Sequence, residues 1–179
     1  MNIIDGLQSK DHQEAYRLLL LLERRSSESG ELYGCFEDFI GLLKSKSSFV
    51  QVRGFRLACA QARWDTEDKL RGSLDALFAA LHAAKPTAVR QCLSALQNVL
   101  RWRAELAGEI ISRLDGLDLS RYKDTMRPLI EQDLQALRTL AGPSVPLNAS
   151  AAPVCRGGGC SHNFSKWENT TPVPIHTGG

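Results

Sequence analysis

The sequence lacks an excess of either charge, since 22 Lys and Arg residues stand against 20 Asp and Glu residues, for a net charge of +2. Domains that bind nucleic acid are usually strongly basic, because much of their affinity comes from neutralising phosphates. A role in binding DNA or RNA is therefore disfavoured. The length of 179 residues suits one domain of ordinary size.

Long hydrophobic runs are also missing. The longest, Leu18 to Leu22, has five residues, far short of the roughly 20 that cross a bilayer. The first ten residues contain Asp5 and no apolar stretch of signal-peptide length. The five cysteines are an odd number, which favours reduced thiols over a disulfide framework. We expect a cytoplasmic protein with no membrane partner.

Motifs of common enzymes are absent as well. The chain contains no G-x-S-x-G, no Walker loop and no H-E-x-x-H. Only His12 and His82 precede residue 143, and neither has a Ser or Cys arrangement that would indicate an activated nucleophile. We expect no enzymatic activity and no cofactor.

Composition divides the chain at Gly142. Five of the seven prolines lie beyond it, in a stretch rich in Ala, Ser, Gly and Asn that has little apolar periodicity. Residues 1–142 are the predicted helical-repeat domain, and residues 143–179 are a predicted flexible tail.

The tail contains one candidate metal site, made of Cys155, Cys160 and His162. Two thiolates and an imidazole within eight residues are ligands that zinc prefers. Their C-x4-C-x-H spacing is not typical of a known zinc module, and a structural site normally needs four ligands. Solvated side chains are the favoured interpretation, with zinc or a reversible disulfide between Cys155 and Cys160 as the alternatives.

The first 142 residues show helical periodicity and no convincing strand alternation. Because the connections are short, consecutive helices should pack antiparallel. The predicted helices are 10–25, 30–44, 48–63, 67–83, 86–102, 104–115 and 121–141.

Several residues mark the ends of these helices. Asp65 or Thr66 should cap the fourth helix, and Pro86 suits the first turn of the fifth. Gly142 suits a C-terminal cap. Pro128 would kink a helix that runs from 121, so that helix either bends there or begins near Thr125.

An internal repeat links two of these helices. Val52-Arg53 aligns with Val89-Arg90, 37 residues later, and an apolar second helix follows each pair. The apolar stripes are wide enough to need a partner helix on each side, which is typical of units that stack into a solenoid.

A Val-Arg pair early in the first helix of a two-helix unit resembles a HEAT repeat. Residues 14–141 also resemble a group of small bacterial helical-repeat proteins, on the stretches around Glu23, Ser45-Phe55, Trp64, Lys85-Cys92 and Tyr122-Leu129. Some members carry a label tying them to iron–sulfur cluster assembly (SufBD). The assembly scaffolds to which that label refers have a β-helical core, and residues 1–142 show no strand pattern that would support one. The resemblance implies a short α-α superhelix of about seven antiparallel helices, HEAT- or armadillo-like.

Arginines next to the apolar stripes form a candidate contact surface. Adjacent units of a solenoid join their faces, so these side chains could bind an acidic partner. The more common alternative is that each arginine pairs with an acidic neighbour, such as Asp65, Asp68, Asp75 or Glu105. We expect a non-catalytic scaffold or adaptor for a protein or peptide partner, whose candidate contact residues are Arg53, Arg56, Arg63, Arg90 and Arg101.

A second hypothesis comes from Trp64-Asp65 and Trp102. Helical-repeat DNA glycosylases hold a damaged nucleotide with Trp and Asp on a concave basic surface, so a nucleic-acid binder or glycosylase-like repair protein is the alternative function. The neutral charge of residues 1–142 opposes it. Because each Trp ends its helix, both indoles could instead cover the corner between two helices.

Overall fold

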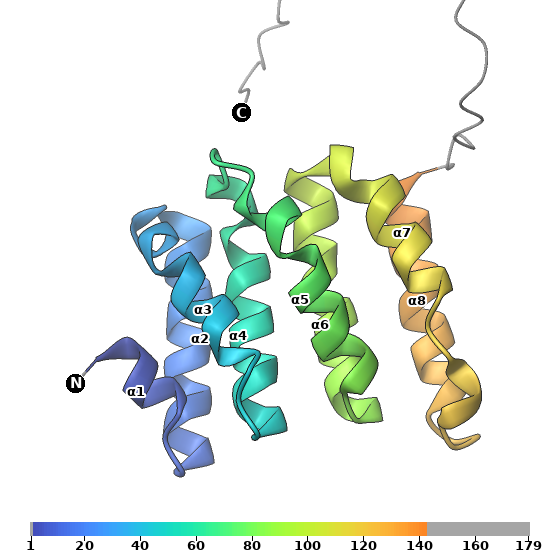
Figure 1. Cartoon of the computed structure of the whole chain (residues 1–179), viewed down its shortest axis with the longest axis horizontal. Helices are drawn as coiled ribbons and strands as arrows, with labels where there is room; N and C mark the ends of the chain where they lie inside the picture. Colours follow the sequence, from blue (N-terminus) through green and yellow to red (C-terminus); the bar gives the residue numbers. More distant parts are fainter. Residues whose placement is uncertain (1, 143–179) are drawn as a thin grey trace, which may run out of the picture. The chain divides into compact units, whose positions relative to one another are not determined.

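The computed structural model describes residues 2–142, and the predicted tail and its metal site lie outside them. The fold of these residues is all-α, as predicted (Figure 1). The α-helices are α1 (Ile3–Leu7), α2 (His12–Glu28), α3 (Phe36–Leu42), α4 (Ser48–Ala60), α5 (Lys69–Ala83), α6 (Pro86–Trp102), α7 (Ala107–Asp115) and α8 (Arg127–Ala141). Short 3₁₀ helices are η1 (Glu31–Cys35), η2 (Gln61–Trp64), η3 (Ala104–Leu106) and η4 (Leu119–Arg121).

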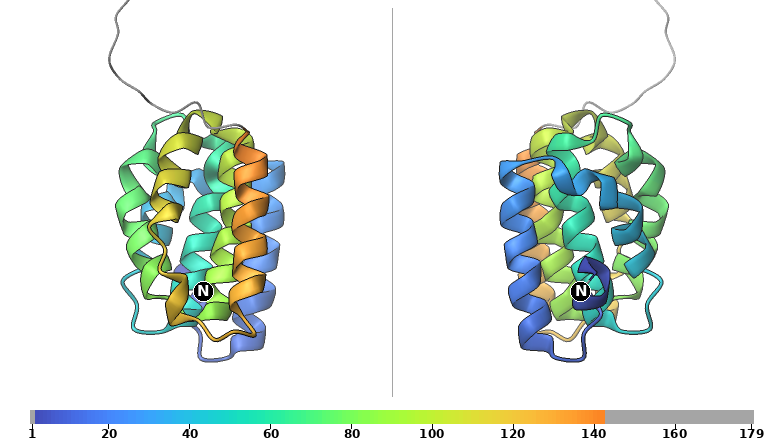
Figure 2. Two further views of the ribbon diagram at one scale, coloured as in Figure 1. Left: turned by 90° about the vertical axis from the view of Figure 1, so that its right-hand side faces the viewer. Right: turned by 90° about the vertical axis from the view of Figure 1, so that its left-hand side faces the viewer.

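The helices are arranged in two layers. Helices α2, α4, α6 and α8 pack side by side in chain order, and α3, α5 and α7 cover one side of them (Figure 2). The core lies between the layers and is largely aliphatic, and Phe36, Phe39 and Phe55 are its largest fully buried side chains. The other side of the α2–α4–α6–α8 layer has no helix packed on it among the described residues.

Local chemistry explains several helix ends. Asp11 caps α2, because its carboxylate accepts hydrogen bonds from the amides of Gln13 (2.9 Å) and Glu14 (3.1 Å). Pro86 opens α6 as predicted. Gly142 follows α8 with φ +77°, a conformation that favours glycine.

Some predicted boundaries were wrong. Helix α8 begins at Arg127 and not at 121, which agrees with the alternative of a start near Thr125 and not with a bend at Pro128. Pro128 lies in the first turn of this helix and causes no kink. The predicted helices 30–44 and 104–115 each begin as a 3₁₀ turn before the α-helix starts. The five-residue helix α1 was not predicted.

Gly54 sets the separation of α3 and α4. A Cβ atom at this position would lie 2.6 Å from the carbonyl oxygen of Phe39 and 2.7 Å from Cβ of Leu42. Both distances are shorter than van der Waals contact allows, so the two helices pack this closely only because residue 54 has no side chain.

Candidate functional site

The free side of the α2–α4–α6 layer contains a groove of about 630 Å³. Helix α2 provides one wall, α4 and η2 the floor, and α6 the other wall. We call it the arginine–tryptophan groove. Its lining consists of Glu23, Ser26, Ser27, Arg56, Ala60, Arg63, Gln91, Ser94, Ala95, Asn98, Arg101 and Trp102.

Arg63 lies against two indole rings at one end of this groove. Its guanidinium carbon lies 4.8 Å from the ring centroid of Trp64 and 4.9 Å from that of Trp102. Trp64 is fixed in turn, because its indole N–H donates to the carbonyl of Ser26 at 2.6 Å. These contacts orient the planar guanidinium. One of its N–H groups donates to the carbonyl of Ser27 at 3.3 Å, which leaves the other N–H groups available.

The exposure of Trp102 differs from that of Trp64. Trp102 is 47% exposed although it is large and hydrophobic, whereas Trp64 is partly buried. Both residues lie at the end of a helix of the same layer, as expected from the sequence. Trp64 covers a corner between helices, and Trp102 leaves part of its ring open to a ligand in the groove.

The side chain of Arg56 on α4 lines the arginine–tryptophan groove and contacts both α2 and α6. Its guanidinium donates to both carboxylate oxygens of Glu23, at 2.8 and 2.7 Å, and to the side-chain oxygen of Gln91 at 3.2 Å. The bidentate pair with Glu23 joins α4 to α2 and neutralises the charge of Arg56, and the hydrogen bond to Gln91 joins α4 to α6. This residue therefore contributes a bridge and little free positive charge.

The five predicted contact arginines do not form one exposed strip. Arg53 is only 4% exposed, so its assignment to a surface was wrong. Arg90 pairs with Asp133 of α8, at 2.6 Å. Arg63 and Arg101 line the groove, and neither forms an ion pair with a carboxylate among the residues that the structure describes.

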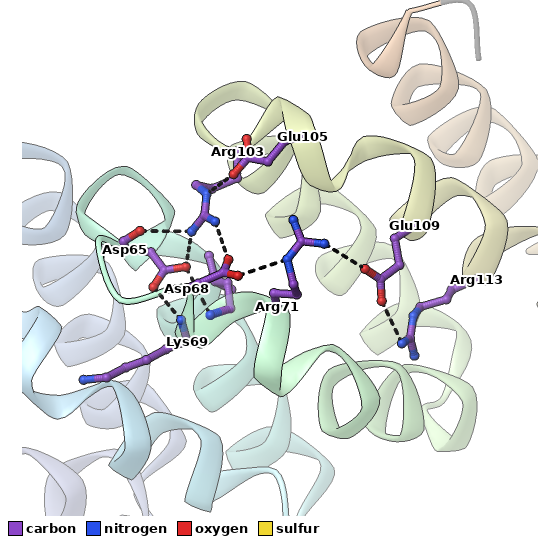
Figure 3. Close-up of polar contacts among 9 residues, drawn as sticks. Asp65, Asp68, Lys69, Arg71, Arg103, Glu105, Glu109 and Arg113 are labelled. Atoms are coloured by element: carbon purple, nitrogen blue, oxygen red, sulfur yellow. Dashed lines mark hydrogen bonds and ion pairs between the residues drawn. The ribbon is translucent and has the colours of Figure 1, made fainter. Parts of the chain in front are cut away.

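The acidic residues expected to pair with these arginines bind other arginines instead. Asp75, inside α5, pairs with Arg113 of α7. Asp65, Asp68 and Glu105 lie where α4 leads into α5 and α6 into α7. Arg103 donates to the carboxylates of Asp65, Asp68 and Glu105 (Figure 3). Arg71 extends the network from Asp68 (3.0 Å) to Glu109 (3.4 Å). These ion pairs connect neighbouring helix pairs.

Asp65 is the centre of this network. Its side chain is fully buried, and it accepts hydrogen bonds from the hydroxyl of Tyr33 (2.8 Å) and the amides of Lys69 (2.8 Å) and Leu70 (3.1 Å). Asp65 therefore accepts hydrogen bonds from the first amides of α5 and caps this helix, as predicted. The residue immediately before the helix is Asp68, which has the left-handed conformation at φ 58°. Because these contacts occupy its carboxylate, Asp65 is not available to act on a nucleotide.

The residues that sequence reasoning missed are Arg103, Tyr33 and Glu23. The sequence contained a signal for Arg103, because Arg103 follows Trp102 in the same way as Asp65 follows Trp64. Opposite charges at corresponding positions of two successive helix pairs indicate an ion pair between them.

Arg103 lowers the pKa of the carboxyls of Asp68 and Glu105 from their ordinary values of 3.8 and 4.5. A carboxyl with a lowered pKa in the folded state stabilises the fold above its ordinary pKa. That stabilisation is lost as the pH falls through the folded value. We therefore expect the free energy of unfolding to decline below about pH 4.5 and the double variant D68N/E105Q to show a shallower decline.

Urea unfolding from pH 3 to 7 measures this dependence. The matched control is D124N/E131Q, which removes one exposed Asp and one exposed Glu outside the network. If both double variants follow the pH dependence of the wild type, the ion pairs of Arg103 do not contribute to acid stability.

The cysteines of the helices are not arranged as a metal site. Cys59 and Cys92 are buried free thiols, and burial raises the pKa of Cys59 well above its ordinary value and that of Cys92 to about 12. Within residues 2–142 no group of His, Cys, Asp and Glu could hold a metal ion. The candidate ligands Cys155, Cys160 and His162 lie outside the described residues.

No helix in the described part of the chain is long and apolar enough to cross a membrane. Comparison with known proteins finds no family model, no curated protein and no solved structure that matches this chain.

Proposed function

We propose that the chain is a non-catalytic, HEAT-like scaffold that binds an acidic segment of a protein partner in the arginine–tryptophan groove. The observation that carries the proposal is Arg63, a cation that lies against two indole rings and has no carboxylate partner in the described residues. An oriented guanidinium loses little conformational entropy when it binds a carboxylate.

The remaining groove residues support a peptide as the ligand. Arg101 supplies a second charge, and Trp102 offers an exposed aromatic surface of the kind that dominates peptide-binding interfaces. Ser94 adds a hydroxyl to the groove lining. The amide of Asn98 donates to the carbonyl of Cys59 at 2.9 Å, which leaves its side-chain oxygen free for a backbone N–H.

The alternative ligand is nucleic acid, which an exposed Trp next to arginines could also accommodate. The small positive charge on this side of the layer disfavours a nucleic-acid ligand. Glu23 and Asp133 neutralise Arg56 and Arg90, and Glu23 itself lines the groove. A phosphate backbone would meet two free arginines beside a carboxylate, which is little charge for a polyanion.

Selection from a random peptide display library, followed by calorimetry with the enriched peptides, tests the proposal. We expect enrichment of Asp and Glu, and a loss of affinity of about 30-fold or more for R63E/R101E, because two charge-assisted contacts become repulsive. The control R17E/R25E makes the same change of charge at exposed positions of α2 outside the groove.

Three outcomes would contradict the proposal. The library could yield no acidic preference, or the control could lose as much affinity as R63E/R101E. Binding of a DNA duplex that weakens steeply with salt, in the absence of peptide binding, would favour the nucleic-acid alternative.

A further inference from the structure

A second hollow, of about 310 Å³, lies on the same face toward the N-terminal ends of α4 and α6. We call it the Arg53 pocket, and its polar lining includes His12, Ser48, Arg53, Lys85 and Thr87. The bridge formed by Arg56 and Gln91 lies between it and the arginine–tryptophan groove, since Gln91 lines both and Arg56 only the latter.

Arg53 is a buried cation without an acidic partner. Its guanidinium donates to the carbonyl of Leu7 at 2.7 Å and lies 3.2 Å from Nδ1 of His12. No carboxylate of the described residues forms an ion pair with it, whereas Arg56, Arg90, Arg103 and Arg113 each have one or more. A charge removed from water without a counter-ion is costly to the fold.

The pKa values reflect this difference. Acidic neighbours raise the pKa of Arg90 and Arg113, but the pKa of Arg53 is lowered, and burial is the cause. The carbonyl of Leu7 offers only a partial negative charge. Two of the five N–H groups of Arg53 are occupied by its neighbours, so donors remain for another acceptor.

The rest of the pocket is also suited to negative charge. The pocket is lined by the first residues of two helices, Ser48 and Phe49 of α4 and Thr87 and Ala88 of α6. No side chain caps the start of either helix. The amides of a first turn carry partial positive charge. Lys85 adds a full charge at the rim, and no acidic residue lines the pocket.

We propose that the Arg53 pocket binds an oxyanion, the phosphate or carboxylate group of a small ligand, with Arg53 as its buried counter-ion. Tyr16 and Phe49, each about half exposed, line the pocket and would contact an apolar or aromatic part of that ligand. This site is independent of peptide binding in the arginine–tryptophan groove.

Nuclear magnetic resonance of the full ¹⁵N-labelled chain tests the inference with three probes at constant ionic strength in chloride: inorganic phosphate, phenyl phosphate and phenylacetate. We expect saturable shifts of the amides of Ser48, Phe49, Thr87 and Ala88, with a dissociation constant on the order of 1 mM. A stronger response to phenyl phosphate than to phenylacetate identifies phosphate as the group, and the reverse identifies carboxylate.

Two variants assign the effect to the pocket. R53Q should abolish the shifts; because it also removes the hydrogen bond to Leu7 and could unfold the chain, K85E provides a second test at an exposed position. K85E should weaken binding about tenfold, and K44E, the same change at an exposed site outside the pocket, should leave it unchanged.

Absence of saturable shifts with all three probes would overturn the proposal. Equal weakening by K85E and K44E would also overturn it, because the binding would then be non-specific charge attraction. R63E/R101E should retain the shifts, so failure of the peptide proposal leaves this result unaffected.

Discussion

Replacing Asp65 by alanine is expected to lower the free energy of unfolding by about 3 to 5 kcal/mol, the usual cost of removing one partner of a buried ion pair. Arg103 would lose its buried partner, and the first amides of α5 would lose their acceptor. The hydroxyl of Tyr33 would also be left without the acceptor that it has at 2.8 Å. Chemical denaturation measures the difference.

The matched control for this prediction is Asp75→Asn. Asp75 also pairs with an arginine, Arg113, at 2.6 Å, but its side chain is 88% exposed. Exposed ion pairs contribute little, so we expect a change of less than about 0.5 kcal/mol. If D65A cost no more than D75N, the Arg103 network would not hold the helix pairs together.

Gly54→Ala is expected to destabilise the fold by about 1 to 3 kcal/mol, although alanine is the better helix former. The added methyl group would meet the carbonyl oxygen of Phe39 and Cβ of Leu42. A backbone atom cannot rotate away as a side-chain tip can, so α3 and α4 would have to separate. Thermal and urea unfolding of the variant measure this cost.

Gly72→Ala is the control, because it measures the stability that alanine adds over glycine in a helix without a steric clash. Gly72 lies inside α5, and nothing lies within 4 Å of the place that its Cβ would occupy. This variant should therefore be more stable than the wild type, by up to about 1 kcal/mol. A stabilising effect of both substitutions would show that the contact of α3 with α4 is not as close as described.

The helices themselves could be predicted because their signals are local. Pro86 and Trp102 are the first and last residues of α6 in the prediction and in the structure, since proline fixes the start and a wide apolar stripe fixes the face. Helix α1 could not be found this way, because five residues are too few to show periodicity. Pro128 indicated the true start of α8 more reliably than the periodicity that preceded it.

The candidate site was less predictable, because pairing depends on which helices become neighbours. Arg53 and Arg56 are three positions apart on one helix, yet one is buried against α1 and the other binds Glu23 of α2. The sequence pattern could not show which of these two arginines is buried and which one forms an ion pair. The choice between a paired and a free arginine depends on residues more than 30 positions away, such as Glu23 for Arg56 and Asp133 for Arg90.

Mapping a bound acidic peptide on the ¹⁵N-labelled chain shows directly whether the arginine–tryptophan groove receives it. We expect the indole N–H of Trp102 and the amides of Ser94, Asn98 and Arg101 to shift, together with the guanidinium of Arg63. Shifts confined to α3, α5 and α7 would contradict it, because those helices cover the opposite side of the layer.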